Sequence, residues 1–218
     1  KATQLSEIVI DAKNEKLLGV QKVSKISLQL RPISSAHEYL RAVPGLFIAQ
    51  HAGGGKAEQI FLRGFDNDHG TDFAVLVDDI SVNLSSHAHG QGYADLHFLI
   101  PETVQRADYY KGPHEVSLGN FAVSGAAKFS TKDRLNRNFV KLEYGQYDYA
   151  RALAMISLIN EGNFLTKNNE SAYIAIEGTY NKSFFESAQN LRRLNTFTKY
   201  AIDLSENHQL KTSISTFH

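Results

Sequence analysis

The sequence predicts an α+β domain that is followed by long amphipathic antiparallel strands. Two observations support this fold class. All four prolines and most of the glycines lie before residue 138, among short runs with mixed helix and strand signals. Beyond residue 138 the chain changes to long runs in which apolar and polar residues alternate, which is the period of a strand with one apolar face. The shift in composition places a boundary near residues 132–138.

One helix is predicted in the first part, in the stretch SSAHEYLRAVPG. Ser35 and Glu38 have the spacing of a capping box, Leu40 and Val43 provide an apolar stripe, and the proline–glycine pair ends the helix. Short strands are predicted from runs of β-branched and aromatic residues at 7–10, 26–30, 59–63, 73–77, 106–110 and 126–131. The apolar positions of the helix and the central strands predict a core of Leu40, Val43, Ile60, Leu62, Val75 and Val77.

The second part predicts strands with one apolar and one polar face. Their apolar residues are Val140, Leu142 and Tyr144, then Ile174, Ile176 and Tyr180, then Tyr200, Ile202 and Leu204, and finally Leu210 and Ile214. The run at 151–159 is less regular, because Leu153 and Met155 share a face with Arg151. Strands of about ten residues with one apolar face are what the wall of a transmembrane β-barrel requires. A soluble antiparallel sheet gives the same alternation, so the pattern alone supports both structures.

Composition excludes several classes of protein. The 23 acidic and 23 basic residues give no net charge, which removes the electrostatic argument for nucleic-acid binding. The chain has no cysteine, so it has neither a disulfide framework nor a thiolate metal site or nucleophile. No run of about 18 apolar residues is present, which excludes a membrane-spanning helix.

The stretch GGGK at 53–56 looks at first like a phosphate-binding loop. Such a loop needs two glycines that bracket four residues, then lysine followed by serine or threonine. Here Lys56 is followed by Ala57, and the next element has strand rather than helix propensity. The glycines therefore predict an exposed turn between two strands.

Five stretches, in order, carry a resemblance to a known family: SSAHEYLRAVPGLFI, IFLRGFDND, VLVDDISVN, LIPETVQRADYYKGP and SLGNFAVSGAAKFSTK. Together they resemble the plug domain of TonB-dependent outer-membrane receptors. The most specific pieces are the pair Arg63-Gly64, the VDD stretch, and KGP followed by Leu118-Gly119. The stretch KLEYGQYD is similar to the family's first barrel strand, so the resemblance covers essentially the whole chain. One departure is Asp79, which stands where the family usually has glycine, although aspartate tolerates left-handed conformations.

The resemblance implies four segments. These are an N-terminal segment at 1–20 with a possible TonB box, a plug domain at 21–132, a linker at 133–138 and the start of a β-barrel at 139–218. The family's barrel has 22 strands, whereas this chain supplies about five. Five strands cannot close around a plug, and open sheet edges cannot sit in lipid. We therefore expect an N-terminal part of a receptor with an incomplete transmembrane β-barrel.

The function implied by the resemblance is transport across the bacterial outer membrane. Such receptors take up a scarce nutrient, for example a siderophore, a metal chelate or another large solute, and their plug gates the barrel and helps to bind the ligand. The expected partners are the energy-transducing protein TonB, the small-molecule or metal-chelate ligand and outer-membrane lipid, with no nucleic acid. Neither catalysis, a cofactor nor a resident metal is expected.

The stretch SEIVIDA resembles the segment through which these receptors pair with TonB. Its central residues are Glu7, Ile8, Val9 and Ile10. An extended β-branched run of this kind adds as a strand to the edge of a partner's sheet. The alternative is that these residues form the first plug strand and that the TonB box lies upstream.

Two arginines, Arg63 and Arg106, match the family's paired plug arginines, which meet glutamates on the inner barrel wall and hold the plug in place. Their glutamate partners are expected beyond His218. The alternative is that both are ordinary surface arginines.

Three outward loops are implied at 50–55, 66–70 and 85–93. They hold the candidate ligand-binding residues His51, His69, His87, His89, Gln91 and Tyr93. His87 and His89 lie two residues apart in a glycine-flanked loop, where imidazoles coordinate metal or donate hydrogen bonds to an anionic ligand. The alternative for any single histidine is a polar loop whose side chains are already satisfied.

Two other classes of function compete with the receptor. A metal-dependent hydrolase would use the histidines with Asp66, Asp68 or Asp95 as ligand or base. The sequence has no HExxH or comparable ligand set, and the downstream strands have no role in such an enzyme. A soluble or surface binding module is the other alternative, and in it the sheet would lie outside lipid.

Overall fold

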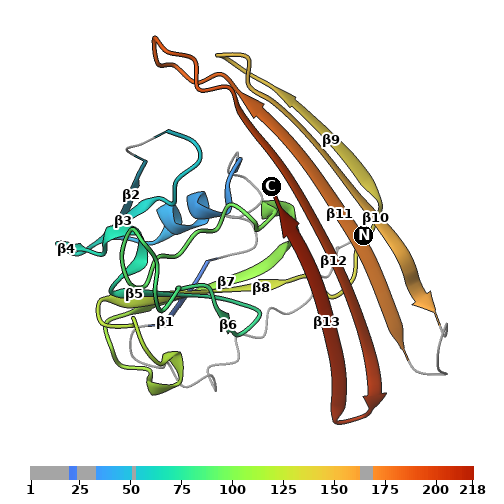
Figure 1. The fold of residues 1–218 in the computed structure, drawn as a ribbon. Coiled ribbons are helices and arrows are strands. Elements are labelled where there is room, and N and C mark those ends of the chain that lie inside the picture. Colours follow the sequence, from blue (N-terminus) through green and yellow to red (C-terminus); the bar gives the residue numbers. More distant parts are fainter. Residues whose placement is uncertain (1–19, 24–32, 51–52, 163–168) are drawn as a thin grey trace, which may run out of the picture.

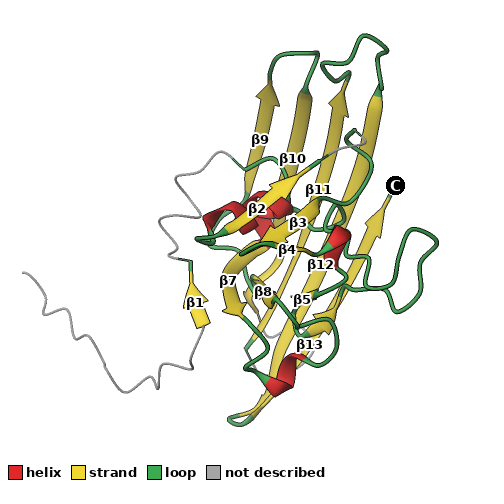
Figure 2. Ribbon diagram, turned by 90° about the vertical axis from the view of Figure 1, so that its left-hand side faces the viewer, coloured by secondary structure: helices red, strands yellow, loops and turns green. Residues whose placement is uncertain are grey.

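The computed structural model describes residues 20–23, 33–50, 53–162 and 169–218. The strands expected at 7–10 and 26–30 lie outside these residues. The elements from β1 to β8 form an N-terminal domain, and β9 to β13 form a curved sheet that we call the wall sheet (Figure 1). The domain lies against the concave face of the wall sheet (Figures 1 and 2).

The N-terminal domain contains two sheets. The larger has the strand order β1-β7-β8-β5-β6, in which β5 and β8 run parallel and the other pairs antiparallel. The smaller is antiparallel with the order β2-β3-β4. The strands are β1 (Val20–Lys22), β2 (Leu46–Ala49), β3 (Gln59–Leu62), β4 (Phe65–Asp66), β5 (Phe73–Val77), β6 (Ile80–Ser81), β7 (Val104–Lys111) and β8 (Gly125–Thr131).

The helix predicted in SSAHEYLRAVPG is present as the 3-10 helix η1 (Ala36–Ala42). The side chain of Ser35 caps it by accepting a hydrogen bond from the backbone N–H of His37. Glu38 accepts a 2.7 Å hydrogen bond from the backbone N–H of Ser34, one residue before the position that a capping box would use. Three further 3-10 turns follow: η2 (Asp68–Gly70), η3 (Pro101–Thr103) and η4 (Val116–Leu118).

The turn between β5 and β6 explains the departure from glycine at position 79. Asp78 and Asp79 both have positive φ, 48° and 68°, which is the pattern of a two-residue type I′ hairpin turn. Aspartate is one of the few non-glycine residues that enter this region at low cost. The structure therefore accommodates the substitution in the turn itself.

The predicted core forms between the two sheets and η1. Leu40, Val43, Ile60, Leu62 and Val75 are buried, and Val77 packs against them partly buried. Each fully buried side chain of this size contributes about 1.5–3 kcal/mol relative to an exposed one. The six core residues predicted from the sequence are thus confirmed.

The wall sheet is antiparallel, with the order β13-β12-β11-β10-β9. Its strands are β9 (Phe139–Tyr144), β10 (Ala150–Gly162), β11 (Glu170–Asn181), β12 (Leu191–Ser205) and β13 (His208–Phe217). Because neighbouring strands alternate in direction, the connections at 145–149 and 182–190 lie at the same end, which we call the loop end (Figure 1). In the described residues β9 and β13 are edges, so the sheet is open. No helix in the described part of the chain is long and apolar enough to cross a membrane.

The alternation predicts one apolar and one polar face, and it holds only for the apolar outer face, because the inner face also carries a hydrophobic cluster. The inner face packs on Ile100 and Leu135 through Leu153, Met155, Tyr173, Ala175 and Phe197. The outer face exposes large apolar side chains, namely Val140, Leu142, Tyr144, Ile156, Leu158, Ile176, Leu194, Leu204, Leu210 and Ile214. Ile202 departs from this pattern, since it is buried, although it belongs to none of the buried hydrophobic clusters of the described residues.

Candidate functional site

Four of the side chains predicted for ligand contact lie together on the N-terminal domain. His69 belongs to η2, whereas His87, His89 and Tyr93 belong to the loop that follows β6. The ring centroid of His69 lies 4.6 Å from that of His89 and 5.7 Å from that of Tyr93. The ring of His87 stacks on Tyr93 at 4.2 Å. With the neighbouring Asp68, we call this group the histidine cluster.

The ring of His69 is held in a defined orientation. The side chain is fully buried, and its Nδ1 lies 2.7 Å from the backbone carbonyl oxygen of Ala57. Because a carbonyl only accepts, Nδ1 carries the hydrogen and Nε2 is the acceptor atom of the neutral ring. Nε2 lies 3.6 Å from Oδ1 of Asp68. Burial lowers the pKa of His69 below its ordinary value of 6.5, so the ring is neutral at pH 7.

His87 and His89 have different roles, although they lie two residues apart. The backbone N–H of His89 donates to Nδ1 of His87 at 3.2 Å, and the His87 ring stacks on Tyr93. The Nε2 atom of His89 lies 4.0 Å from Oδ1 of Asp68. His89 therefore joins Asp68 and His69, whereas His87 shapes the loop that carries it.

Ala57 connects the cluster to the end of the first predicted loop. Its carbonyl accepts from His69, and its N–H donates to the phenolic oxygen of Tyr93 at 3.0 Å. His51, in that first loop, lies outside the described residues. Gln91 is exposed and takes part through its backbone carbonyl, which accepts from Oγ1 of Thr71 at 3.0 Å.

The buried side chain of Asn83 fixes the backbone around the cluster. Its amide donates to the carbonyl oxygens of Gly70 at 3.0 Å, Phe73 at 3.1 Å and Gly92 at 2.9 Å. Its oxygen accepts from the N–H of Val75 at 2.7 Å. One side chain thus pairs four backbone groups from the η2 turn, β5 and the loop after β6, each of which is costly to leave unpaired when buried.

The two glycines of the loop after β6 are not equivalent. Gly92 has φ 82°, and a Cβ there would lie 2.8 Å from the Cα of Thr71 and 2.9 Å from the ring of Phe121. A Cβ on Gly90 would meet no atom within 4 Å. The close approach allowed by Gly92 is therefore to the domain's own backbone.

We predict that Gly92→Ala lowers the free energy of unfolding of the N-terminal domain by at least about 1 kcal/mol, because it combines a positive φ with a backbone clash. Gly90→Ala should change it by less than about 0.5 kcal/mol, as is usual for an unstrained surface position. Denaturant unfolding of the two variants checks the difference. Equal stabilities would show that the strain at Gly92 is not real.

A groove of about 460 Å³ lies at the loop end, between the first predicted loop and the wall sheet. Its lining includes Gln50, Gly53, Gly54, Gln146, Tyr147, Tyr149, Phe184, Phe185, Gln189 and Leu191. The N–H of Gly54 donates to the side-chain oxygen of Gln189 at 3.4 Å. The first predicted loop therefore contacts the connections at the loop end of the wall sheet.

Arg63 and Arg106, the two arginines predicted to hold the plug in place, are exposed. Arg106 pairs with Asp108 on its own strand at 2.9 Å, and 55% of its side chain is exposed. Arg63 lies in the turn after β3 with φ 50°. Whether either meets a glutamate beyond His218 stays a prediction. The residues Glu7 to Ile10 lie outside the described part of the chain.

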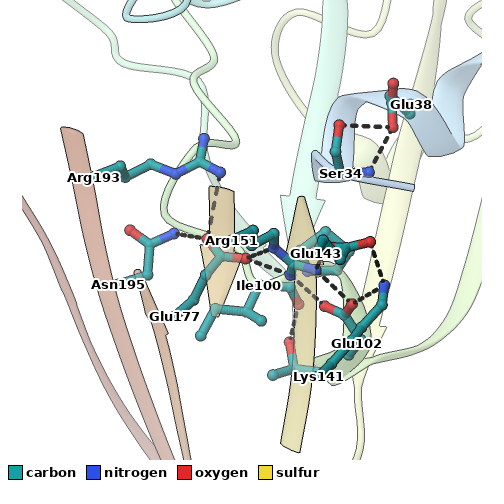
Figure 3. Close-up of polar contacts among 12 residues, drawn as sticks. Ser34, Glu38, Ile100, Glu102, Lys141, Glu143, Arg151, Glu177, Arg193 and Asn195 are labelled. Carbon is teal, nitrogen blue, oxygen red and sulfur yellow. Dashed lines mark hydrogen bonds and ion pairs between the residues drawn. The ribbon is translucent and has the colours of Figure 1, made fainter. Parts of the chain in front are cut away.

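The wall sheet contacts the N-terminal domain through a buried ion cluster that we did not predict (Figure 3). Arg151 on β10 donates to both carboxylate oxygens of Glu102 in η3, at 2.8 and 2.6 Å. It also donates to Glu143 at 2.8 Å and, from Nε, to Glu177 at 2.8 Å. Lys141 pairs with Glu102 at 3.1 Å and with Glu143 at 3.0 Å.

The charges of this cluster are balanced once Arg193 is included, which donates to Glu177 at 3.3 Å. Three carboxylates then face three cations. Burial alone would raise the pKa of Glu102, but the hydrogen bonds and charges of Arg151 and Lys141 hold that pKa below its ordinary value. The irregular polar position noted in the sequence at 151 was the signal for this contact.

A second buried cation, Lys199 on β12, also reaches the N-terminal domain. Its Nζ lies 3.1 Å from Asp78, 3.1 Å from Asp133 and 2.7 Å from Oγ1 of Thr131. The side chain of Lys199 is only 3% exposed. Polar inner-face residues of the wall sheet thus dock the domain at two separate points.

Comparison with known proteins gives a family match over just over half of the chain. The family model described as TonB-dependent Receptor Plug Domain matches residues 13–126 of the 218. This range contains η1, the histidine cluster and Glu102.

Solved structures share the fold over nearly the whole chain. The siderophore receptor PirA from Acinetobacter baumannii superposes with a TM-score of 0.64 at 16% identity, covering 91% of this chain and 31% of PirA. The ferric yersiniabactin uptake receptor FyuA from Yersinia pestis gives 0.69 at 16% identity, covering 92% and 31%. FpvA from Pseudomonas aeruginosa, bound to a pyoverdine, gives 0.65 at 15%, covering 93% and 25%. This chain spans about a third or less of the length of these proteins.

Proposed function

The chain belongs to the TonB-dependent receptor family, and from this premise we propose that it provides the plug domain and the first barrel strands of an outer-membrane uptake receptor. The solute is a siderophore-type metal chelate or another large, scarce compound. The plug corresponds to residues 21–132 and the barrel begins at 139, after a linker at 133–138. As in the rest of the family, the role is transport and not catalysis.

The histidine cluster is the observation that carries a ligand-binding role. His87, His89 and Asp68 are exposed, and the buried His69 and half-buried Tyr93 lie directly beneath them. Imidazole nitrogens and an aromatic face, in loops fixed from below by Asn83, form a preorganised polar surface. We assign ligand contact to His69, His87, His89, Gln91 and Tyr93, together with His51.

The groove at the loop end supports the same role. It combines the glutamines Gln50, Gln146 and Gln189 with the aromatic side chains of Phe184 and Phe185. The rings of Phe184 and Phe185 stack on each other at 4.4 Å. Small-molecule sites commonly combine apolar lining with a few polar groups, and this groove has that character.

The outer face of the wall sheet favours the membrane receptor over a soluble binding module. Val140, Leu142 and Ile214 are 70%, 77% and 66% exposed and lie on the same face. A contiguous exposed apolar face of this extent marks a surface that is covered by lipid or by a partner. Contact with outer-membrane lipid is the assignment that agrees with the family.

We also propose that Arg63 and Arg106 hold the plug in place in this receptor. Both arginines are exposed on the N-terminal domain. We propose that they meet glutamates of the barrel wall. In the buried cluster around Arg151 the origins of the two charges are reversed. There the wall sheet provides the arginine, and the N-terminal domain provides its partner Glu102.

We predict that His87→Ala combined with His89→Ala weakens solute binding to the complete receptor at least tenfold, or about 1.4 kcal/mol. The change removes two imidazole rings, one of which stacks on Tyr93, and it leaves the core side chains unaltered. The probes are the ferric complexes of enterobactin, yersiniabactin and pyoverdine, and the variant is measured with the one that binds the unsubstituted receptor.

His114→Ala is the matched control, since His114 is exposed but lies outside the three loops. It should leave the affinity unchanged. If the double variant binds the chelate as tightly as the unsubstituted receptor, the histidine cluster is not the solute site.

A further inference from the structure

Three potential metal-ligand atoms converge in the histidine cluster. They are Oδ1 of Asp68, Nε2 of His69 and Nε2 of His89, and all lie within 4.8 Å of one another. In the described residues no other set of three histidine or acidic side chains meets this criterion. We infer that these atoms bind a free divalent transition-metal ion, of which Zn²⁺ is the representative.

The ligand set is oriented before any ion arrives. Nδ1 of His69 donates to the carbonyl of Ala57, which turns Nε2 toward Asp68 and fixes the tautomer that coordinates metal. The backbone N–H of His89 is held by Nδ1 of His87, whose ring is stacked on Tyr93. His87, Tyr93 and Ala57 are therefore positioning residues, and Asp68, His69 and His89 are the ligands.

Binding an ion requires the three ligand atoms to move closer together, from spacings of 3.6 Å up to at most 4.8 Å. Bonds of about 2.0–2.1 Å to nitrogen and oxygen place two ligands of a tetrahedral Zn²⁺ about 3.4 Å apart. Asp68 lies 3.6 Å from His69 and 4.0 Å from His89. The side chains of Asp68 and His89 are 56% and 35% exposed, so they can move by this amount, whereas the buried His69 is the fixed point.

The chemistry of the donors selects the class of ion. Two imidazoles and one carboxylate suit Zn²⁺ and its neighbours from Fe²⁺ to Cu²⁺, whereas Ca²⁺ and Mg²⁺ prefer all-oxygen sites. Three protein ligands leave a position open for water or for a donor atom of a solute. The exposed side chains of Asp68 and His89 place this open position toward solvent.

This inference goes beyond the proposed uptake of a chelate, because it concerns an ion without a chelator. It shares residues with the proposed solute site but makes a different prediction for His87. Loss of His87 should weaken the contact with a solute, yet it leaves all three metal ligands in place.

The test is a titration of the purified receptor, from which metal has first been removed with a chelator. Binding of Zn²⁺ is measured by calorimetry, and binding of Co²⁺ by its visible absorption. The unsubstituted receptor should bind one equivalent more than His89→Ala, and Asp68→Asn should weaken that equivalent at least tenfold. Loss of a ligand should lower the affinity for the metal at least as much as the roughly 10- to 100-fold that is typical when a residue that only orients a ligand is lost. His114→Ala should retain the equivalent at unchanged affinity. His87→Ala should retain the stoichiometry, with an affinity lowered by no more than the roughly 10- to 100-fold typical for the loss of an orienting residue.

Equal stoichiometry and affinity in the unsubstituted receptor and in His89→Ala would overturn the metal site. So would loss of the equivalent in His114→Ala. Both ligand variants alter exposed side chains, so matching unfolding curves without metal exclude a folding defect. The two proposals can fail separately. If the variant without His87 and His89 still binds the chelate but has lost the Zn²⁺ equivalent, the metal site is supported and the proposed solute site is refuted.

Discussion

Arg151→Met is expected to destabilise the packing of the N-terminal domain against the wall sheet by about 3–5 kcal/mol. This is the cost of removing one partner from a buried ion cluster. The substitution leaves Glu102, Glu143 and Glu177 without their shared cation. Glu177 is fully buried, so its charge cannot be hydrated in place of the lost pair. Methionine fills a similar volume, which restricts the effect mainly to charge and hydrogen bonding.

Hydrogen exchange of the amides of β7 and β8 in the complete receptor measures this effect, because η3, which carries Glu102, leads directly into β7. Their exchange should accelerate in Arg151→Met. Lys182→Met, in the connection that follows β11, is the matched control, since the pair of Lys182 with Asp148 is 3.6 Å long and both side chains are exposed. Such surface pairs contribute at most about 1 kcal/mol. Equal exchange in the two variants would show that the Arg151 cluster does not hold the plug.

Ile8→Pro is expected to abolish uptake by the complete receptor while leaving solute affinity unchanged. If Glu7 to Ile10 add as a strand to the sheet of TonB, proline removes a ladder donor, and its ring disfavours the pairing. The proposed solute contacts lie elsewhere, in the loops around the histidine cluster. Transport and binding should therefore separate in this variant.

Ile8→Val is the control for this experiment, because valine keeps the β-branched side chain and the backbone N–H. It should transport at nearly the normal rate. Uptake is measured in cells and affinity on purified receptor. Normal uptake by Ile8→Pro would mean that the pairing segment lies upstream of residue 7 and that these residues have another role.

Much of the fold follows from local signals in the sequence. The strand at 73–77 was predicted with its observed bounds, and the capped helix after Ser35 is present. Alternation placed Val140 and Leu142 on the outer face of the wall sheet, and both are exposed. These features depend on period and capping, which short stretches of sequence contain.

Other features depend on which distant residues meet. β2 (Leu46–Ala49) was not predicted, because a four-residue apolar run after a helix has no period of its own. The sequence marked Arg151 as a polar residue on an apolar face, but not that Glu102, 49 residues earlier, is its partner. Pairing across such separations is set by the packing of the sheets.

The candidate site was predicted in part. The loops placed His69, His87 and His89 near one another, and the structure brings them together. Their spacing suggested that His87 and His89 act as a pair. The stacking of His87 on Tyr93 and the approach of His89 to Asp68 separate their roles, because loop conformation decides where adjacent side chains point.

The proposed transport function is tested most directly by the accumulation of radiolabelled ferric siderophores in cells that produce the complete receptor. Accumulation is measured before and after the inner membrane is de-energised with a protonophore. We expect at least one chelate to accumulate above the level in cells without the receptor, and this accumulation to stop when the protonophore is added. Accumulation that continues in de-energised cells, or that is the same with and without the receptor for every chelate, would contradict an active uptake receptor.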